Sequence, residues 1–305
     1  MKLSLTNGTE PEVSRGPFSH PGYDSRRMRQ AIYFMLFRAC AAVVVLVLVI
    51  ILGNIVWNGL ANISWAFLTE MPLRGGAQGG IFPAIVGTIY LMLLVAAFSV
   101  PVGVFTAIYL VEYQRKGRMT GFIRTAVQNL AGVPSVVYGL LGLGLFVLAL
   151  SLGSSLLAAG LTLSIMVLPL TITASWEAIN AVPSSLREAS LALGATRWQT
   201  IRHHILPYSF SGILTGMILS ISRAAGETAP IMLIGAAVAI NHLPSGLMDS
   251  FMALPFTIFY FVQVSSAPNA YGLAYAAALI LVVLVVGMNL VAIVLRKKYR
   301  EKYKW

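Results

Sequence analysis

"IFPAIVGTIYLMLLVAAFSVPVGVFTAIYLV", residues 81–111, decides the fold class of this chain. The stretch contains no charged side chain, and it is longer than the roughly 20 apolar residues that a helix needs to cross a bilayer. A helix that lies half-buried on a soluble domain keeps a polar face, and this stretch has none. We therefore predict that residues 81–111 form a membrane-spanning helix.

Five further apolar runs have the same character, at residues 32–57, 122–152, 156–178, 209–239 and 271–295. Of the 305 residues 58% are hydrophobic and only 10% are charged, whereas about a quarter of the residues in soluble domains are charged. The chain is therefore predicted to be an all-α integral membrane protein with six transmembrane helices. A shorter apolar run, residues 251–264, is interrupted by Pro255 and is expected to be an interfacial helix on the outer side.

The basic residues predict the orientation, since Lys and Arg are retained on the cytoplasmic side of a membrane. They gather before the first run, in the loops after the second and fourth runs, and in the C-terminal stretch "RKKYREKYKW". The opposite loops contain one basic residue, Arg74. Both termini are therefore predicted to be cytoplasmic. This asymmetry explains most of the formal charge of +11, and because the basic residues are spread over four segments we expect no nucleic-acid partner.

Sequence motifs of enzymes are absent. The chain contains no GxxxxGK[ST] phosphate loop, no HExxH, no CxxC and no GxSxG. The four histidines are not spaced as a metal site, and the lone Cys40 excludes an internal disulfide. We therefore expect no catalytic residue, no metal and no cofactor. Energy for uphill transport would have to come from a partner chain or from an ion gradient.

The loop between the fourth and fifth runs is the most specific feature: "AVPSSLREASLALGATRWQTIRHHILPYSFSGI", residues 181–213. Pro183, followed by two serines, is typical of a helix start. Apolar residues then recur at helical spacing until Gly194 interrupts them, and "GATRWQTI" is expected to form a second short helix. Leu206-Pro207 is expected to close the loop before the next span. From periodicity alone, an ordinary interfacial helix fits this loop equally well.

The same loop resembles the signature loop of ABC-importer permeases, which reads EAA, three residues, Gly, nine residues, Ile, one residue, Leu-Pro. Two positions depart from it, since Ser190 replaces the second alanine and His204 replaces the isoleucine. In that family the loop docks into a groove of a separate ATP-hydrolysing subunit, and its glutamate, here Glu188, faces this partner. The resemblance implies that the coupling residues are Glu188, Ala189, Ser190, Gly194, Leu206 and Pro207.

Other stretches are similar to the permeases of the phosphate-specific import system: "GGIFPAIVGTIYL" (79–91), "VPVGVFTAIYLVEY" (100–113), "NLAGVPSVVYGLLGL" (129–143) and "SRAAGETAPIML" (222–233). The "GETAP" form and "MALP" at 252–255 look more like the A permease subunits of that system than the C subunits. The resemblance implies the type I ABC importer permease fold. It also implies three kinds of partner, namely a PstC-like second permease subunit, a dimer of PstB-like ATPase subunits and a PstS-like extracytoplasmic phosphate-binding protein.

The apolar runs, the basic residues, and the glycines and prolines before the first run predict how the chain is organised within the cell membrane. We expect a flexible cytoplasmic tail before the first span and a basic cytoplasmic tail after the last one. The expected parts are the tail (1–30), the first transmembrane helix with its outer loop (31–80), the permease core (81–296) with its coupling loop (179–208), and the basic tail (297–305).

"ISRAAGETAPIML", residues 221–233, places two opposite charges inside the fifth run. Arg223 lies about 14 residues, or roughly 20 Å, along that run, which is close to the bilayer midplane. A charge at this depth is costly, so it is expected to face the protein interior or a water-filled cavity. Glu227 lies one helical turn further and is expected on the same face. Either the pair only neutralises itself and joins two helices, or it lines the translocation path.

These inferences predict a transmembrane permease subunit of an ATP-driven phosphate importer, which forms half of the translocation path and couples to a separate ATPase. A permease for another oxyanion, such as sulfate, molybdate or phosphonate, is an alternative within the same class. A secondary phosphate transporter that uses Glu227 as a proton relay is a further alternative, but it does not account for the coupling-loop signature. A membrane-embedded sensor would leave Arg223 unexplained.

The predicted topology can be tested by cysteine labelling of intact cells, in a chain whose Cys40 has been replaced by Ser. A reagent that does not cross the membrane should label Ser245→Cys and Gly76→Cys from outside but should not label Lys298→Cys, because the C-terminus is predicted to be cytoplasmic. Labelling of Lys298→Cys from outside would mean that residues 251–264 cross the bilayer.

Overall fold

The computed structural model describes residues 23–76, 78–114, 117–265 and 267–302. The chain divides into two compact units, Met1–Asn54 and Ile55–Trp305. Helix α1 (Tyr23–Leu60) contains the first predicted span, so that span is confirmed as a helix. Residues 23–30 of the predicted tail are helical, whereas residues 1–22 of the tail and residues 303–305 of the predicted basic tail lie outside the described residues.

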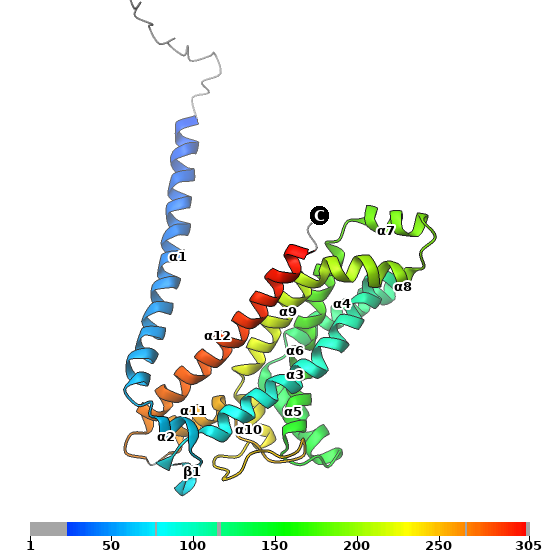
Figure 1. Cartoon of the computed structure of the whole chain (residues 1–305). Coiled ribbons are helices and arrows are strands. Elements are labelled where there is room, and N and C mark those ends of the chain that lie inside the picture. Colours follow the sequence, from blue (N-terminus) through cyan, green and yellow to red (C-terminus); the bar gives the residue numbers. More distant parts are fainter. Residues whose placement is uncertain (1–22, 77, 115–116, 266, 303–305) are drawn as a thin grey trace, which may run out of the picture. The chain divides into compact units, whose positions relative to one another are not determined.

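The second unit is almost entirely helical (Figure 1). Its helices are α2 (Trp65–Thr69), α3 (Phe82–Ile108), α4 (Arg118–Ala131), α5 (Ser135–Gly142), α6 (Leu156–Asn180), α7 (Ser184–Ala192), α8 (Arg197–Thr200), α9 (Leu206–Ala225), α10 (Ala229–Ile234), α11 (Leu254–Gln263) and α12 (Ala270–Lys302). Three π-helical segments extend or join them: η2 (Tyr109–Tyr113), η3 (Leu143–Ala149) and η4 (Ile201–Ile205). A short antiparallel hairpin, β1 (Pro72–Leu73) and β2 (Gln78–Gly79), encloses the 3₁₀ turn η1 (Arg74–Gly76).

The packing of this unit centres on α6, which packs against both α3 and α9, and these two helices also contact each other. Small residues let these helices approach closely. A Cβ added at Gly212 would lie 2.6 Å from the Cβ of Ala178, and one added at Gly216 would overlap Ala174. Small residues are typical of such contacts inside membranes, where van der Waals packing replaces the hydrophobic effect between helices. Helix α12 packs beside α9, and α11 packs on α12.

The two ends of this unit differ in composition. Helices α7 and α8 and the C-terminal end of α12 lie at one end, and α2, α10, α11 and the hairpin lie at the other (Figure 1). The described basic residues of the coupling loop and of the C-terminal segment therefore share one end, as the topology prediction requires. Which side of the membrane that end faces stays a prediction.

The loop that follows α10 closes the opposite end. The N–H groups of Leu156 and Leu157 at the start of α6 donate to the carbonyls of Asp249 and Leu247. The Asp249 carboxylate accepts hydrogen bonds from the Ser245 hydroxyl and from backbone N–H groups of the same turn. These bonds lower the pKa of Asp249, because they favour its charged form. The loop therefore satisfies backbone donors that the start of α6 leaves free.

The third predicted span, 122–152, is wrong as a single helix. Helices α4 and α5 meet at a bend of 98°, and Gly132, Val133 and Pro134 lie between them. Pro134 cannot donate a hydrogen bond and disfavours a helical conformation in the residue before it, so the helix ends there. The Tyr138 hydroxyl donates to the Leu130 carbonyl at 2.8 Å and thereby bonds across the break.

The fifth predicted span, 209–239, is wrong at both ends. Helical structure runs without interruption from Arg197 through η4 into α9, so Leu206-Pro207 does not close the loop. The π-helical turn η4 before Pro207 explains this. Its hydrogen bonds join residues five apart and not four, so the α-helical pattern is already interrupted there. Pro207 has no backbone N–H, so the interruption leaves no donor of this residue unpaired. At the other end α9 stops at Ala225 and the chain restarts as α10. In a continuous helix, the Pro230 ring would clash with the carbonyl of residue 226.

Three predicted spans are confirmed as helices. Helix α3 contains most of the second predicted span, α6 contains the fourth and α12 contains the sixth, whereas α11 is a short apolar helix within residues 251–264. Within the described residues, five helices are long and apolar enough to cross a membrane. The bent pair α4–α5 gives a sixth span if it is counted as one. The chain is thus an all-α, multi-pass membrane protein.

The close approach of α6 and α9 predicts a strong effect of size at Gly216. Gly216→Val would place its Cβ against Ala174, and such overpacking typically costs about 1–3 kcal/mol. Gly287→Val on α12 is the matched control, because a Cβ at Gly287 would have nothing within 4 Å. Thermal unfolding of the purified protein in detergent should show a lower Tm for Gly216→Val only. Equal Tm values would contradict the packing of α6 on α9.

Candidate functional site

Arg223 and Glu227 form an ion pair at the end of α9. The Arg223 Nε lies 3.6 Å from the Glu227 Oε1, and the two side chains are 47% and 19% exposed within this chain. Arg223 belongs to the last turn of α9, where the free carbonyls of the helix end favour a cation. The structure thus brings the two predicted residues together, but across a helix end and not along a continuous helix.

Two hydrogen bonds to neighbouring helices fix the turn that carries Arg223. The Ser222 hydroxyl lies 2.7 Å from the Asn289 Oδ1 on α12. One turn earlier, the buried hydroxyls of Ser220 and Thr171 lie 3.0 Å apart and connect α9 to α6. Hydrogen bonds between membrane helices hold them in a defined register. The backbone of Arg223 is therefore tied to two helices, while half of its side chain is free to meet a ligand.

Glu227 stands on the short non-helical segment between α9 and α10. Its N–H donates to the Ala224 carbonyl at 3.3 Å, and α10 begins two residues later. Helix α10 is held by α5: a Cβ added at Gly139 would lie 2.8 Å from the Pro230 Cα. The bent third span therefore sets the position of the segment that carries the carboxylate.

The residues matched to the coupling signature lie at the opposite end of α9, on α7 and its connection to α8. Glu188 and Ala189 are exposed, whereas Ser190 is buried and its hydroxyl lies 2.9 Å from the Thr200 hydroxyl. Ser190, which departs from the family signature, therefore connects α7 to α8. Sequence reasoning required only that Ser190 be small and did not predict this bond.

Gly194 ends α7 in the left-handed conformation, with φ of 83°. Its N–H donates to the Leu191 carbonyl at 3.0 Å, and the N–H of Ala195 donates to the Ser190 carbonyl at 3.2 Å. This pair of bonds is the Schellman motif, which favours glycine because an L side chain in this conformation is strained. A Cβ at Gly194 would meet no atom within 4 Å, so the backbone angle and not crowding explains the glycine.

The last part of the signature lies inside the continuous helix. Leu206 and Pro207 begin α9 and are half-buried. His204, at the isoleucine position of the family signature, is exposed. Its neighbours Ile201 and Ile205 are buried against the ends of α3 and α6 instead. The departure at His204 therefore leaves the packing of this segment intact.

Sequence reasoning missed a second ion pair, between Arg187 on α7 and Glu112 in η2. The Arg187 Nε lies 2.9 Å from the Glu112 Oε1, and the two side chains are only 19% and 12% exposed. The two residues are 75 positions apart in the sequence, so no local pattern relates them. Two features of the sequence were available as signals. Arg187 lies directly before the matched Glu188, and Glu112 lies at the end of an apolar run.

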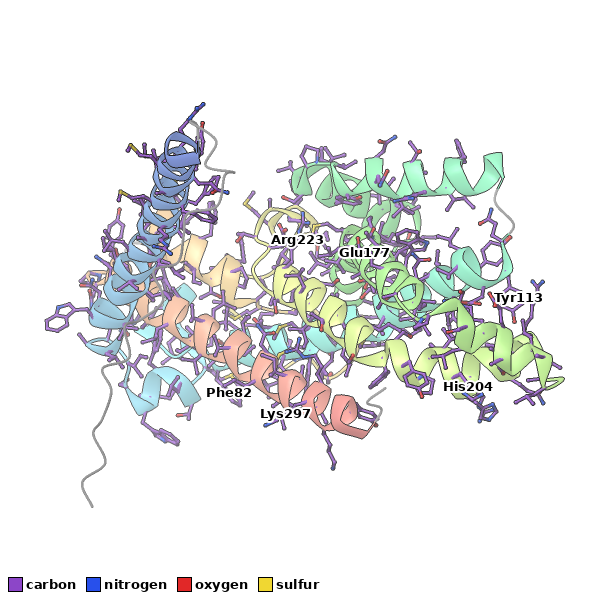
Figure 2. All side chains as sticks on the ribbon, turned by 90° about the horizontal axis from the view of Figure 1, so that it is seen from above. Phe82, Tyr113, Glu177, His204, Arg223 and Lys297 are labelled. Carbon is purple, nitrogen blue, oxygen red and sulfur yellow. The ribbon has the colours of Figure 1, made fainter. Side chains whose placement is uncertain are left out.

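Arg223 and the coupling residues are separate places in the molecule. Figure 2 shows Arg223 well away from Tyr113 and His204. Within the described residues, no three His, Cys, Asp or Glu side chains come together in a way that could hold a metal ion. The chain has a multi-pass helical core. It carries a charged pair at a helix break and exposes α7 and α8 at one end. Together these features are those of a membrane permease.

The chain belongs to the family of binding-protein-dependent transport system inner membrane components, whose family model matches residues 99–301. It is an ABC importer permease subunit. The solved structure of a bacterial ABC transporter involved in the import of the acidic polysaccharide alginate shares this fold. The TM-score is 0.64 and the sequence identity is 17%, with 89% of this chain and 99% of that chain covered.

Two relatives are more similar in sequence. One is the phosphate transport system permease protein PstA 1 of Mycobacterium tuberculosis (strain CDC 1551 / Oshkosh), which is 34% identical over 278 residues. That match covers 89% of this chain and 90% of the relative. The other is the phosphate transport system permease protein PstA of Yersinia pestis, 34% identical over 277 residues, with 90% of this chain and 92% of the relative covered.

Proposed function

We propose that this chain is the transmembrane permease subunit of an ATP-driven phosphate importer and that phosphate passes Arg223 and Glu227. The observation that carries the proposal is the ion pair at the break between α9 and α10, inside an apolar helical core. Relatives named as phosphate permeases match nearly the whole chain and support this substrate.

Arg223 supplies the attraction for an anion. A guanidinium group is planar and permanently charged, and its parallel N–H groups match two oxygens of a tetrahedral oxyanion. The Arg223 side chain is about half exposed, so donors remain available beside the Nε that faces Glu227. The ion pair at 3.6 Å is long for a direct hydrogen bond, which leaves Arg223 able to change partner when an anion arrives.

Glu227 supplies discrimination between oxyanions. Near neutral pH, inorganic phosphate still carries one or two protons, and a carboxylate accepts a hydrogen bond from such an OH group. Sulfate has no proton to donate, so the same carboxylate repels it. Glu227 also neutralises part of the charge of Arg223, which prevents the anion from being held too tightly to be released.

Helices α7 and α8 form the docking surface for a separate ATPase in this proposal. Glu188 is exposed there together with three exposed apolar side chains, Leu191, Leu193 and Trp198. Leu193 is 89% exposed, and the three side chains together form an apolar group that a partner could cover. We propose a PstB-like ATPase dimer at this end, a PstC-like permease beside this chain, and a PstS-like phosphate-binding protein at the opposite end.

The role of the ion pair can be separated from simple charge balance by substitution. The double variant Arg223→Gln, Glu227→Gln removes both charges together, so a purely structural pair should tolerate it. We expect this variant to assemble but to lose phosphate uptake at least about tenfold, because no guanidinium remains for the anion. Arg223→Lys should also be strongly impaired, since it keeps the charge but loses the planar fork.

Uptake of labelled phosphate by the complete complex in vesicles is the measurement, with assembly of the ATPase checked in parallel. Glu227→Gln alone keeps the size and an acceptor, so it should retain some uptake while sulfate competes more strongly. Wild-type uptake by the double variant would reduce the pair to a structural ion pair and would remove the basis of the phosphate assignment.

The left-handed conformation of Gly194 predicts which substitutions disturb the docking surface. Gly194→Ala should weaken binding of the ATPase about tenfold, because a non-glycine residue in this conformation costs roughly 1–2 kcal/mol. Gly194→Asn is the matched control, since Asn tolerates the left-handed region better although its side chain is larger. Co-purification of the ATPase from membranes measures the effect. If Ala is tolerated and Asn is not, side-chain size and not backbone strain determines docking.

A further inference from the structure

We propose that Arg187 and Glu112 act as positioning residues, forming a clamp that passes movement of the docking helix α7 to the second span, α3. The clamp consists of these two side chains and the carbonyls of Ile179 and Val182. The inference rests on the proposed docking of an ATPase at α7. The clamp connects α7 to α3, which is neither the helix before α7 nor the helix after it in the chain.

Arg187 uses three of its nitrogens at once. Its Nε donates to the Glu112 Oε1 at 2.9 Å, its Nη1 donates to the Val182 carbonyl at 2.5 Å, and its Nη2 donates to the Ile179 carbonyl at 2.8 Å. Glu112 belongs to η2 at the end of α3, and the two carbonyls belong to the C-terminal end of α6 and the residues after it. One guanidinium group therefore joins α7 to two other helices.

The chemistry of the clamp favours a fixed geometry. A guanidinium group holds its five donors in a rigid plane, so three simultaneous bonds define both the distance and the orientation of α7. The carbonyls at the end of α6 carry the negative partial charge of the helix dipole and add to the attraction. Because both charged side chains are largely shielded from solvent, the pair is screened less than a surface ion pair.

Contacts beyond the clamp extend from α3 toward Arg223. Helix α3 lies against α6, and a Cβ added at Gly103 would lie 2.6 Å from the Thr171 Cγ2. Thr171 in turn is hydrogen bonded to Ser220, which lies one turn before Arg223 on α9. Displacement of α3 by the clamp therefore acts on the helix pair that holds the anion-binding residue.

This role separates binding of the ATPase from transmission of its movement. The clamp side chains are largely shielded from solvent, whereas Glu188, Leu193 and Trp198 of the docking surface are exposed. Loss of the clamp should leave the ATPase bound while phosphate no longer stimulates its activity. Loss of the docking surface should remove the ATPase itself.

The test uses the complete complex with Arg187→Gln, Glu112→Gln and the double variant. Arg202→Gln is the matched control, because Arg202 is an exposed basic residue of the same loop and forms no ion pair within the described residues. The measurements are co-purification of the ATPase, basal ATP hydrolysis, and hydrolysis stimulated by phosphate-loaded binding protein. We expect each clamp variant to keep the ATPase and its basal rate, and to lose stimulation about tenfold, since the ion pair that joins α7 to α3 is lost.

The double variant supplies the decisive comparison. If the two side chains act as one unit, the double variant should lose no more stimulation than Arg187→Gln alone, because the second change removes an interaction already lost. Unchanged stimulation in the clamp variants, or additive losses in the double variant, would overturn the inference while leaving the proposed function in place. A wild-type complex that binds no ATPase would overturn the proposed function and the clamp's role with it.

Discussion

Inside a bilayer no water is available to the backbone, so every interruption of a helix must be satisfied by the protein itself. The structure depends on how it meets this constraint at two breaks. At the first, between α4 and α5, the Tyr138 hydroxyl bonds to a carbonyl of the preceding helix. At the second, the N–H groups of Gly226 and Glu227 donate to the carbonyls of Arg223 and Ala224 at the end of α9. The two breaks meet where Gly139 packs on Pro230.

The same constraint explains why charge is found at the second break. A helix end exposes carbonyls that a cation can satisfy, and Arg223 occupies the last turn of α9. An uninterrupted helix would have offered no such partner to the arginine. The break therefore stabilises the charge, and the half-exposed guanidinium remains accessible from the side that no residue of this chain covers.

Hydropathy and loop motifs predicted most of the fold, because a long apolar run admits few structures in a membrane. The spans around α3, α6 and α12 follow directly from their runs. Pro134 and Pro230 lie at the two breaks, but a proline does not specify an angle, so the 98° bend between α4 and α5 could not be predicted from the sequence. At the candidate site the charged pair was visible in the sequence. The Arg187–Glu112 pair was not, since only the packing of α7 on distant helices brings these residues together.

The π-helical turn before Pro207 has a mechanical consequence. It lets a proline lie within one continuous helical segment, Arg197–Ala225, which carries Trp198 near one end and Arg223 near the other. A straight helix of this many residues is roughly 40 Å long, so a rotation of about 5° about one end displaces the other end by about 3.5 Å. In the proposed function, a small rotation at the Trp198 end would therefore change the distance between Arg223 and the anion by about the length of one hydrogen bond.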